Sequence, residues 1–336
     1  MDSLTHIAIG ACIGEAFFEK GFGKKAMIWG ALAQSIPDID FLAALWLDPS
    51  EALLAHRGFT HSILFAILSV FIFSMLAQKI HQPENISFRK WLLFFFAAIF
   101  VHLFIDAFNN YGVGWFEPFS TKRISFNSLY VVDPFFSLAV WVAAIRLFLL
   151  NRFALVRFFW WKAGLIVPLL YLIASVFLKL NNDRALEVEL KKRNINYIRY
   201  FSTPAPLQVF LWYNVVERKN DFLISYRSVL DNRSKITFHE HSKSLQWISS
   251  IDNHESLQRL IRFSQGYFTM EKKQDVLLIN DLRFGQIGGW EKSDAPFVFH
   301  FILSHPVDER LMIQKGRMAM FNQNDMISLL KRIYGN

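Results

Sequence analysis

The sequence predicts an α-helical membrane bundle of about six apolar helices, followed by a soluble α+β domain. The 336-residue chain is 53% hydrophobic and 16% aromatic, more apolar than an ordinary globular enzyme. Long apolar segments fill residues 1–180, whereas polar residues and short alternating segments fill residues 181–336. We therefore expect a membrane-embedded domain over 1–180 and a soluble domain over 181–336.

Six apolar segments make up the first domain. Four of them approach, with their flanks, the ~20 helical residues that cross a bilayer, and they cover residues 63–77, 91–108, 134–150 and 163–178. The two earlier segments, 4–18 and 26–36, are shorter and richer in Gly and Ala, which favours close packing between helices. These two segments either span the membrane or form a hairpin buried in the bundle.

The second domain has the alternation of apolar and polar residues that is typical of strands, interrupted by two helical patterns. Strands are predicted over residues 207–216, 222–228, 276–279 and 297–303. Helices are predicted over residues 255–263 and 325–333. This mixture predicts an α+β domain of roughly 150 residues.

The basic charge of the chain is better explained by a membrane than by nucleic acid. The net charge is +8 at pH 7, and short cytoplasmic connections of membrane proteins hold an excess of Lys and Arg. The connections after the first, third and fifth segments contain Lys20, Lys24, Lys25, Lys79, Arg89, Lys90, Arg152, Arg157 and Lys162. The opposite connections, 37–60 and 109–132, contain only Arg57, Lys122 and Arg123. We therefore expect no nucleic-acid partner, and we expect these opposite connections and the soluble domain on the extracytoplasmic side.

Cysteine usage limits the metal chemistry that is open to the chain. The single cysteine, Cys12, lies in an apolar segment, so a disulfide framework and a cysteine-rich zinc site are both excluded. Any metal must be bound by nitrogen and oxygen ligands. The first residues lack the basic region of a cleaved signal peptide, so we expect them to remain in the mature protein.

Metal-binding side chains gather in four short clusters within or at the ends of apolar segments. The clusters are Asp2/His6, Asp38/Asp40, His56/His61 and His102/Asp106. An unpaired imidazole or carboxylate in such surroundings costs several kcal/mol, so these groups need partners or a positive ion. The charge count places all four clusters at one membrane face. We predict that one or more divalent metals are bound by His6, Asp38, Asp40, His56, His61, His102 and Asp106.

Each cluster also has a simpler explanation. His102 and Asp106 share a helical face and could form a hydrogen bond or a proton relay instead. Asp2 could be a helix cap, and the two aspartates after Pro37 could form a solvated turn. The segment from His56 to His61 is the most specific of the four, although two unrelated surface histidines are the alternative.

The donor atoms of the site limit which metals it would bind. Zn²⁺ fits mixed histidine and aspartate ligation best, and Mn²⁺ also accepts it. A two-metal arrangement could activate water and stabilise a leaving oxygen. Arg57 is expected to bind a phosphoryl group, and an aspartate that is not used by the metal, Asp38 or Asp40, is a candidate general base.

The four motifs together resemble a known family. They are Thr5-His6 with Gly10, Pro37-Asp38-Ile39-Asp40, the run from His56 to Ser62, and His102 to Asp106 followed by Tyr111-Gly112. Over about residues 1–180 they resemble the YdjM-like membrane-bound metal-dependent hydrolases, also described as LexA-binding and inner-membrane-associated. That family is similar in turn to zinc-dependent phospholipase C and single-strand nucleases, and this implies phosphoester hydrolysis.

The expected function is a metal-dependent hydrolase of the bacterial inner membrane that acts on a phospholipid or another lipid-linked phosphoester. Membrane lipid and a small-molecule or lipid phosphoester are the expected partners, and the oligomeric state is open. One alternative is a proton-coupled transporter that uses its His/Asp pairs as a relay. Another is a non-enzymatic membrane regulatory or binding protein.

Overall fold

The computed structural model describes residues 1–82, 85–231, 236–250, 254–273, 276–303, 312–313 and 323–335. The chain forms two compact units. The first unit consists of Met1–Ala43 and Ala55–Ser175, and the second consists of Ala44–Leu54 and Val176–Asn336. A short internal segment therefore belongs with the C-terminal part of the chain.

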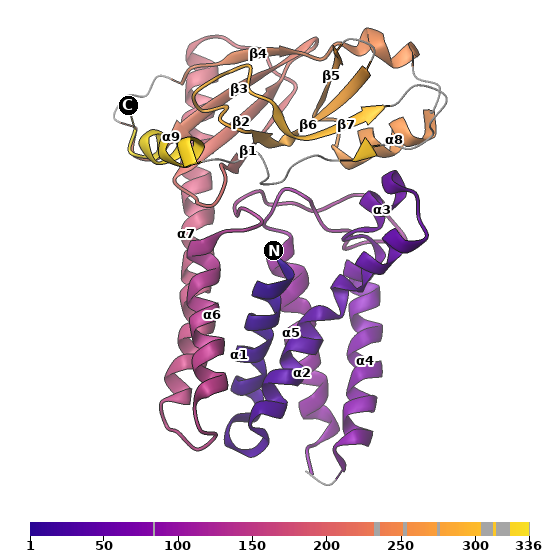
Figure 1. Ribbon diagram of the computed structural model, residues 1–336, viewed down its shortest axis with the longest axis vertical. Helices are drawn as coiled ribbons and strands as arrows, with labels where there is room; N and C mark the ends of the chain where they lie inside the picture. Colours follow the sequence, from indigo (N-terminus) through magenta and orange to yellow (C-terminus); the bar gives the residue numbers. More distant parts are fainter. Residues whose placement is uncertain are drawn as a thin grey trace. The chain divides into compact units, whose positions relative to one another are not determined.

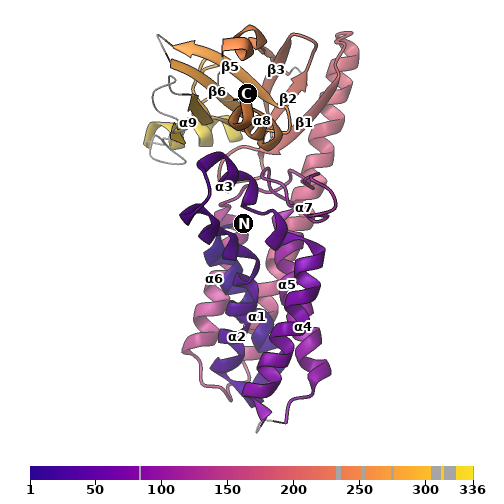
Figure 2. The same cartoon turned by 90° about the vertical axis from the view of Figure 1, so that its right-hand side faces the viewer.

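The first unit is a bundle of helices. It contains α1 (Ser3–Phe22), α2 (Lys24–Ser35), α4 (Ile63–Ile80), α5 (Phe88–Asp106), α6 (Pro134–Leu149) and the first half of α7 (Arg157–Lys192). Two 3₁₀ segments, η1 (Pro37–Leu45) and η2 (Phe59–His61), lie in the connection between α2 and α4. The helices run side by side in both views (Figures 1 and 2), and the start of α1, the end of α5 and the start of α4 meet at one end.

Within the described part of the chain, three helices are long and apolar enough to cross a membrane: α4, α5 and α7. The helices at 4–18 and 134–150 are also present but shorter, with apolar stretches over Ser3–Phe18 and Pro134–Leu149. At about 1.5 Å per residue, the latter reaches roughly 24 Å, less than the ~30 Å hydrocarbon core. The expectation of about six apolar membrane helices is therefore not confirmed, although a helical N-terminal region with three candidate spans is.

Helices α1 and α2 pack unusually close together. A Cβ atom added at Gly10 would lie 2.1 Å from the carbonyl oxygen of Gly30, and one added at Gly30 would lie 1.8 Å from that of Gly10. One added at Gly14 would lie 1.9 Å from the carbonyl oxygen of Ala26. The absent side chains let the two backbones touch, as the Gly-rich composition of these segments predicted.

Polar caps fix where several helices begin. Asp2 accepts a hydrogen bond from the backbone N–H of Thr5 at 2.9 Å and caps α1, so the capping alternative for Asp2 is confirmed. Asp133 caps α6 in the same way. Its second carboxylate oxygen accepts a hydrogen bond from the hydroxyl of Tyr171 at 2.9 Å, while burial raises the pKa of this carboxyl to about 6.

The second unit contains two antiparallel sheets, with strand orders β1-β2-β3-β4 and β5-β6-β7-β8. The first sheet comprises β1 (Arg199–Pro204), β2 (Leu211–Glu217), β3 (Asp221–Ser228) and β4 (His239–Ser242). The second comprises β5 (Phe268–Lys273), β6 (Val276–Gln286), β7 (Phe297–Leu303) and β8 (Met312–Ile313). Residues of both sheets, including Phe201, Tyr213, Phe222, Leu282 and Phe297, share one apolar core.

Shorter elements complete this unit: α3 (Pro49–Ala55), η4 (Leu245–Ser250), α8 (His254–Phe263) and α9 (Gln323–Ile333). The C-terminal half of α7 packs on the first sheet, where Leu186 and Leu190 meet Val216 and Leu223. On the same helix Asn182 donates a hydrogen bond at 2.6 Å to Asn214 of β2. The expected C-terminal domain is thus a β-sheet domain with a few helices.

Candidate metal centre

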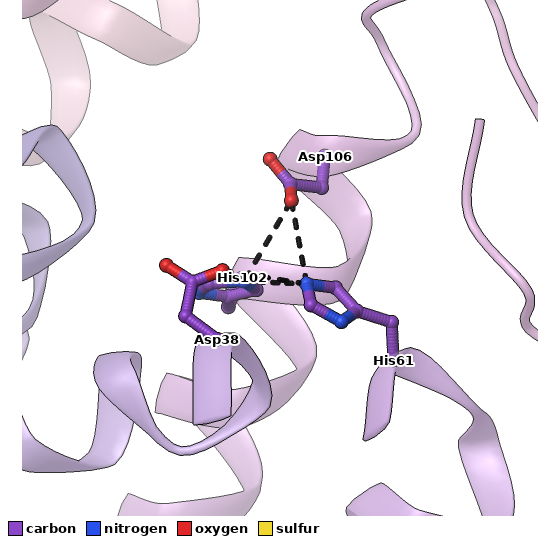
Figure 3. Close-up of side chains that lie close together, drawn as sticks. All are labelled: Asp38, His61, His102 and Asp106. Carbon is purple, nitrogen blue, oxygen red and sulfur yellow. Dashed lines mark hydrogen bonds and ion pairs between the residues drawn. The ribbon is translucent and has the colours of Figure 1, made fainter. Parts of the chain in front are cut away.

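Four side chains that lie far apart in the sequence come together at one end of the helical bundle. Asp38 lies on η1, His61 ends η2, and His102 and Asp106 occupy the last turns of α5. One ligand atom from each residue lies within 4.8 Å of the other three. His61, His102 and Asp106 are fully buried, and Figure 3 shows the four side chains converging.

The ligand atoms of these four residues lie close to one another. The Nε2 atoms of His61 and His102 are 3.2 Å apart. Asp38 Oδ1 lies 3.6 Å from the first of these nitrogens and 3.5 Å from the second. Asp106 Oδ2 lies 3.5 Å and 3.7 Å from the same two atoms. The two imidazoles and two carboxylates therefore face a common point.

This geometry fits a divalent ion with nitrogen and oxygen ligands. Zinc bonds of 2.0–2.2 Å in a tetrahedron place neighbouring ligand atoms about 3.3–3.6 Å apart. The separations of 3.2–3.7 Å around His61 and His102 are close to that value. Asp106 Oδ2 is buried and accepts no hydrogen bond from the described residues, although Arg57 Nε lies 3.0 Å away. The donor set therefore suits a metal ion.

The electrostatics of the group also favour a cation. Burial by itself would lower the pKa of His61, but the surrounding carboxylates, led by Asp106, raise it to about 10. Burial by itself would raise the pKa of Asp38, yet the imidazoles of His102 and His61 hold it well below its usual range. The carboxylates thus stabilise positive charge at this point, whether a proton or a metal ion supplies it.

His6 lies beside the four-residue group and not within it. Its ring stacks on His102 with centroids 3.8 Å apart, and its Nε2 lies 3.1 Å from Asp106 Oδ1. Its Nδ1 lies 3.0 Å from the amide oxygen of Gln34, and Gln34 Nε2 donates a hydrogen bond to the carbonyl of Ala98 at 2.8 Å. His6 therefore links α1 and α2 to α5 and contacts the carboxylate oxygen that faces away from the group.

Asp40 holds His61 from the opposite side of its ring. Asp40 Oδ2 lies 3.3 Å from His61 Nδ1 and accepts a 2.6 Å hydrogen bond from the backbone N–H of Arg57. Thr60 Oγ1 lies 3.4 Å from the same oxygen. A carboxylate on the second nitrogen of a ligating histidine fixes the tautomer and direction of the ring. Asp40 is therefore placed to orient His61.

We expect Asp40→Asn to lower metal affinity by about 10- to 100-fold, the usual cost of losing such a partner. The amide keeps the size of the side chain but removes the charge that holds Nδ1 of His61 protonated. Competition with a chelator of known affinity measures the change. Unchanged affinity in the folded variant would contradict this orienting role.

His56 is the most exposed of the predicted ligands. Its side chain is 37% exposed and its Nδ1 lies 3.2 Å from Asp40 Oδ1, so it contacts the orienting carboxylate and not the four-residue group. Burial of its ring lowers the pKa of His56, although the hydrogen bond with Asp40 opposes this shift. A metal ligand would have to lie in the group of Asp38, His61, His102 and Asp106. The structure does not bring His56 into this group.

His56→Ala is therefore expected to retain a full complement of metal, whereas His61→Ala loses it. The two histidines lie in one short segment, so they form a matched pair for metal analysis of the purified variants. Loss of metal from both variants alike would return His56 to the ligand set.

Arg57 is buried next to Asp106 of this group and is only 3% exposed. Its Nε faces Asp106, its Nη1 donates to Asn109 Oδ1 at 2.6 Å, and its Nη2 donates to the carbonyl of Met1 at 3.1 Å. The amino group of Met1 also contacts Asp106. Arg57 has a φ of 57°, a left-handed conformation that is uncommon outside Gly and Asn. In this conformation its guanidinium binds the protein itself, and its phosphate-binding role stays a prediction.

Other candidates lie away from the group. Glu15 forms a buried ion pair with Arg157 at 2.5 Å. His239 and His241 lie on β4 of the second unit, and His305 lies outside the described residues. Gln34 contacts His6 but was not among the predicted site residues, although a polar amide within an apolar helix was a usable signal.

Comparisons with known proteins agree with the membrane character of the chain. "Uncharacterized protein YfhP" of Bacillus subtilis (strain 168) is 29% identical over 157 residues, which cover 43% of this chain and 47% of that protein. The chain thus matches about half the length of this relative. "Inner membrane protein YbcI" of Escherichia coli (strain K12) is 29% identical over 122 residues, or 36% of this chain and 69% of that protein.

No solved structure matches the chain significantly. The family model described as "YdjM inner membrane protein" matches residues 1–182, more than half of the chain, and this stretch contains every residue of the candidate metal centre. The chain therefore belongs to the YdjM inner membrane protein family.

Proposed function

We propose that this protein is a metal-dependent hydrolase of the inner membrane that cleaves a phospholipid or another lipid-linked phosphoester. The observation that carries the proposal is the buried group of Asp38, His61, His102 and Asp106, whose ligand atoms lie within 4.8 Å of one another. Zn²⁺ suits this donor set best, and Mn²⁺ is the second choice. The four residues account for one ion.

A bound divalent ion would lower the pKa of a water molecule and polarise a phosphoryl oxygen. The protein's own residues would direct that chemistry. Asp40 fixes the ring of His61, and His6 and Arg57 hold the two oxygens of Asp106 from different sides. Asp38, at 17% exposure, is the most accessible of the four. Asp40, which is not one of the four, is the remaining candidate general base.

A lipid substrate is supported by the apolar surface of the segments that carry the ligands. Ile39 and Phe41 of η1 are 49% and 69% exposed, and Phe59 of η2 is 43% exposed. These side chains neighbour Asp38 and His61 in the sequence and lie outside the three candidate spans. Exposed aromatic and aliphatic side chains beside a site at the end of membrane helices suit contact with acyl chains.

The geometry gives less support to a proton relay. A relay needs ionisable groups at successive depths along the helices. Asp38, His61, His102 and Asp106 instead gather around one point, and His6 lies beside them. A transporter would have to carry protons onward from that point through other groups.

The test is metal analysis joined to a substrate screen. Protein purified without chelators should contain stoichiometric zinc or manganese and should hydrolyse a phosphoester from a panel of phospholipids and lipid-linked phosphates. Folded protein that contains neither ion, and takes up neither when offered, would refute the proposal.

We further propose that the site and the C-terminal domain lie on the extracytoplasmic side, as the distribution of Lys and Arg between the connections suggests. Reporter fusions after residue 336, one active only in the cytoplasm and one only outside it, provide the test. A cytoplasmic C-terminus would reverse the assignment.

A further inference from the structure

The connection between α2 and α4 joins the two units in an unusual way. It starts with Asp38 and Asp40 and ends with His56 and His61, all of them in the first unit. Its middle, Ala44–Leu54, belongs to the second unit. The C-terminal part of the chain thus holds the middle of a loop whose two ends supply the candidate metal centre.

One ion pair attaches this middle segment to the second unit. Arg259 of α8 donates to Glu51 Oε1 of α3 at 2.7 Å, and its other terminal nitrogen lies 3.5 Å from Ser50 Oγ. The side chains of Arg259 and Glu51 are 21% and 35% exposed, and Ser50 is buried. Glu255, one turn earlier on α8, also accepts from Arg259 and thereby directs the guanidinium.

Helix α8, which carries Arg259, is fixed in place by packing. Leu257, Leu260 and Phe263 are at most 1% exposed, so one face of the helix is anchored in the core of the domain. Phe263 stacks on Phe284 of β6. Arg259 projects from an element that cannot move independently of the sheets.

We propose that Arg259 and Glu51 form a positioning contact by which the C-terminal domain restrains the ligand-bearing loop and strengthens metal binding. This inference rests on the proposed metal site. Asp40 lies four residues before Ala44 and His56 two residues after Leu54, so holding residues 44–54 reduces the range of positions open to both ends. A site whose ligands are already ordered loses less entropy when the ion binds.

Thermodynamic linkage predicts a reciprocal effect of the metal on the loop. If the restraint raises metal affinity, bound metal must stabilise the restrained loop by the same factor. An ordinary exposed ion pair would stabilise the C-terminal domain slightly and leave metal binding unchanged. Metal release and loop opening together therefore distinguish a positioning contact from a structural one.

The experiment uses the full chain in detergent micelles or nanodiscs, loaded with zinc. Zinc release to a chromogenic chelator should be about two- to five-fold faster in Arg259→Ala, in keeping with the energy of an exposed ion pair. It should be faster still in Arg259→Glu, which places like charges beside each other, and should return towards wild type when Glu51→Arg is added.

Hydrogen exchange of peptides covering 44–61 is the second readout. Exchange should rise in Arg259→Glu, fall again in the double variant, and also rise when zinc is removed from the wild type. Arg218→Glu is the matched control, because it breaks exposed pairs with Asp221 and Glu240 in the same domain and touches neither α3 nor α8. It should change neither readout.

The outcomes separate this inference from the proposed function. Zinc release and loop exchange that stay at wild-type values in Arg259→Glu would overturn the positioning role while leaving the metal site standing. A wild-type protein that takes up no zinc or manganese would overturn the proposed function and this inference with it. Faster release without rescue by the charge swap would show that the ion pair is not the cause.

Discussion

His61→Ala and Asp106→Asn are each expected to remove the proposed metal ion and with it the proposed hydrolase activity. His61 and Asp106 each supply one of the four converging ligand atoms, and both are fully buried. Removing either leaves three donors and strands charges that were balanced in the wild type. We expect metal content below about a tenth of wild type, and activity lower by about 10³-fold or more, since the lost electrostatic stabilisation is worth several kcal/mol.

Metal analysis after exhaustive buffer exchange, together with hydrolysis of the substrate found in the screen, measures both effects. His239→Ala is the control, because this exposed histidine lies on β4 of the other unit. Circular dichroism and a single size-exclusion peak confirm that each variant is folded. A folded Asp106→Asn protein with full metal content would remove this carboxylate from the centre.

The residues of the candidate centre could be predicted because unpaired ionisable side chains in apolar segments cost free energy. His102 and Asp106 lie four residues apart in an apolar segment, so one helical face had to carry both. The antiparallel order of the segments then brings the end of 91–108 beside the starts of 4–18 and 63–77. The structure places His6 and His61 next to that pair, as this reasoning expects.

The sequence did not predict which of these residues would be a candidate ligand and which would orient a ligand. Asp38 and Asp40 are two residues apart and look equivalent in the sequence, but η1 is a 3₁₀ helix in which they point in different directions. Asp38 Oδ1 faces the Nε2 atoms of His61 and His102, whereas Asp40 faces the far side of the His61 ring. Only tertiary structure separates a ligand from the residue that orients it.

The extent of the elements was also hard to predict. The predicted strands over 222–228 and 297–303 are confirmed within one residue, since alternation marks them clearly. Strand β1 was missed: its sequence, Arg-Tyr-Phe-Ser-Thr-Pro, does not alternate, and buried Ser202 is satisfied by Lys179 of α7. Helix α7 continues to Lys192 because its surface changes from exposed apolar side chains to side chains that pack on a sheet, which alters composition without ending the helix.

Enlarging Gly30 is expected to have the largest effect on stability of any substitution outside the metal centre. A Cβ at this position would lie 1.8 Å from the carbonyl oxygen of Gly10, so the two helices must move apart. Overpacking of this kind costs about 1–3 kcal/mol for small additions and more for large ones. We expect Gly30→Ala to lower the melting temperature in detergent clearly, and Gly30→Leu to prevent assembly of the bundle.

Gly30→Ala should also weaken the candidate metal centre, because it moves α1 and α2 apart. Gly30 lies one turn before Gln34 on α2, and Gly10 lies one turn after His6 on α1, so separating the helices pulls on the hydrogen bond between Gln34 and His6. His6 in turn contacts Asp106 and stacks on His102. Gly30→Ala should therefore release zinc faster than wild type, as well as melt earlier. Leu32→Phe, which enlarges an exposed side chain on α2, should do neither. Earlier melting with unchanged zinc release would mean that the centre is held by α5, η1 and η2 alone, without support from the glycine contact.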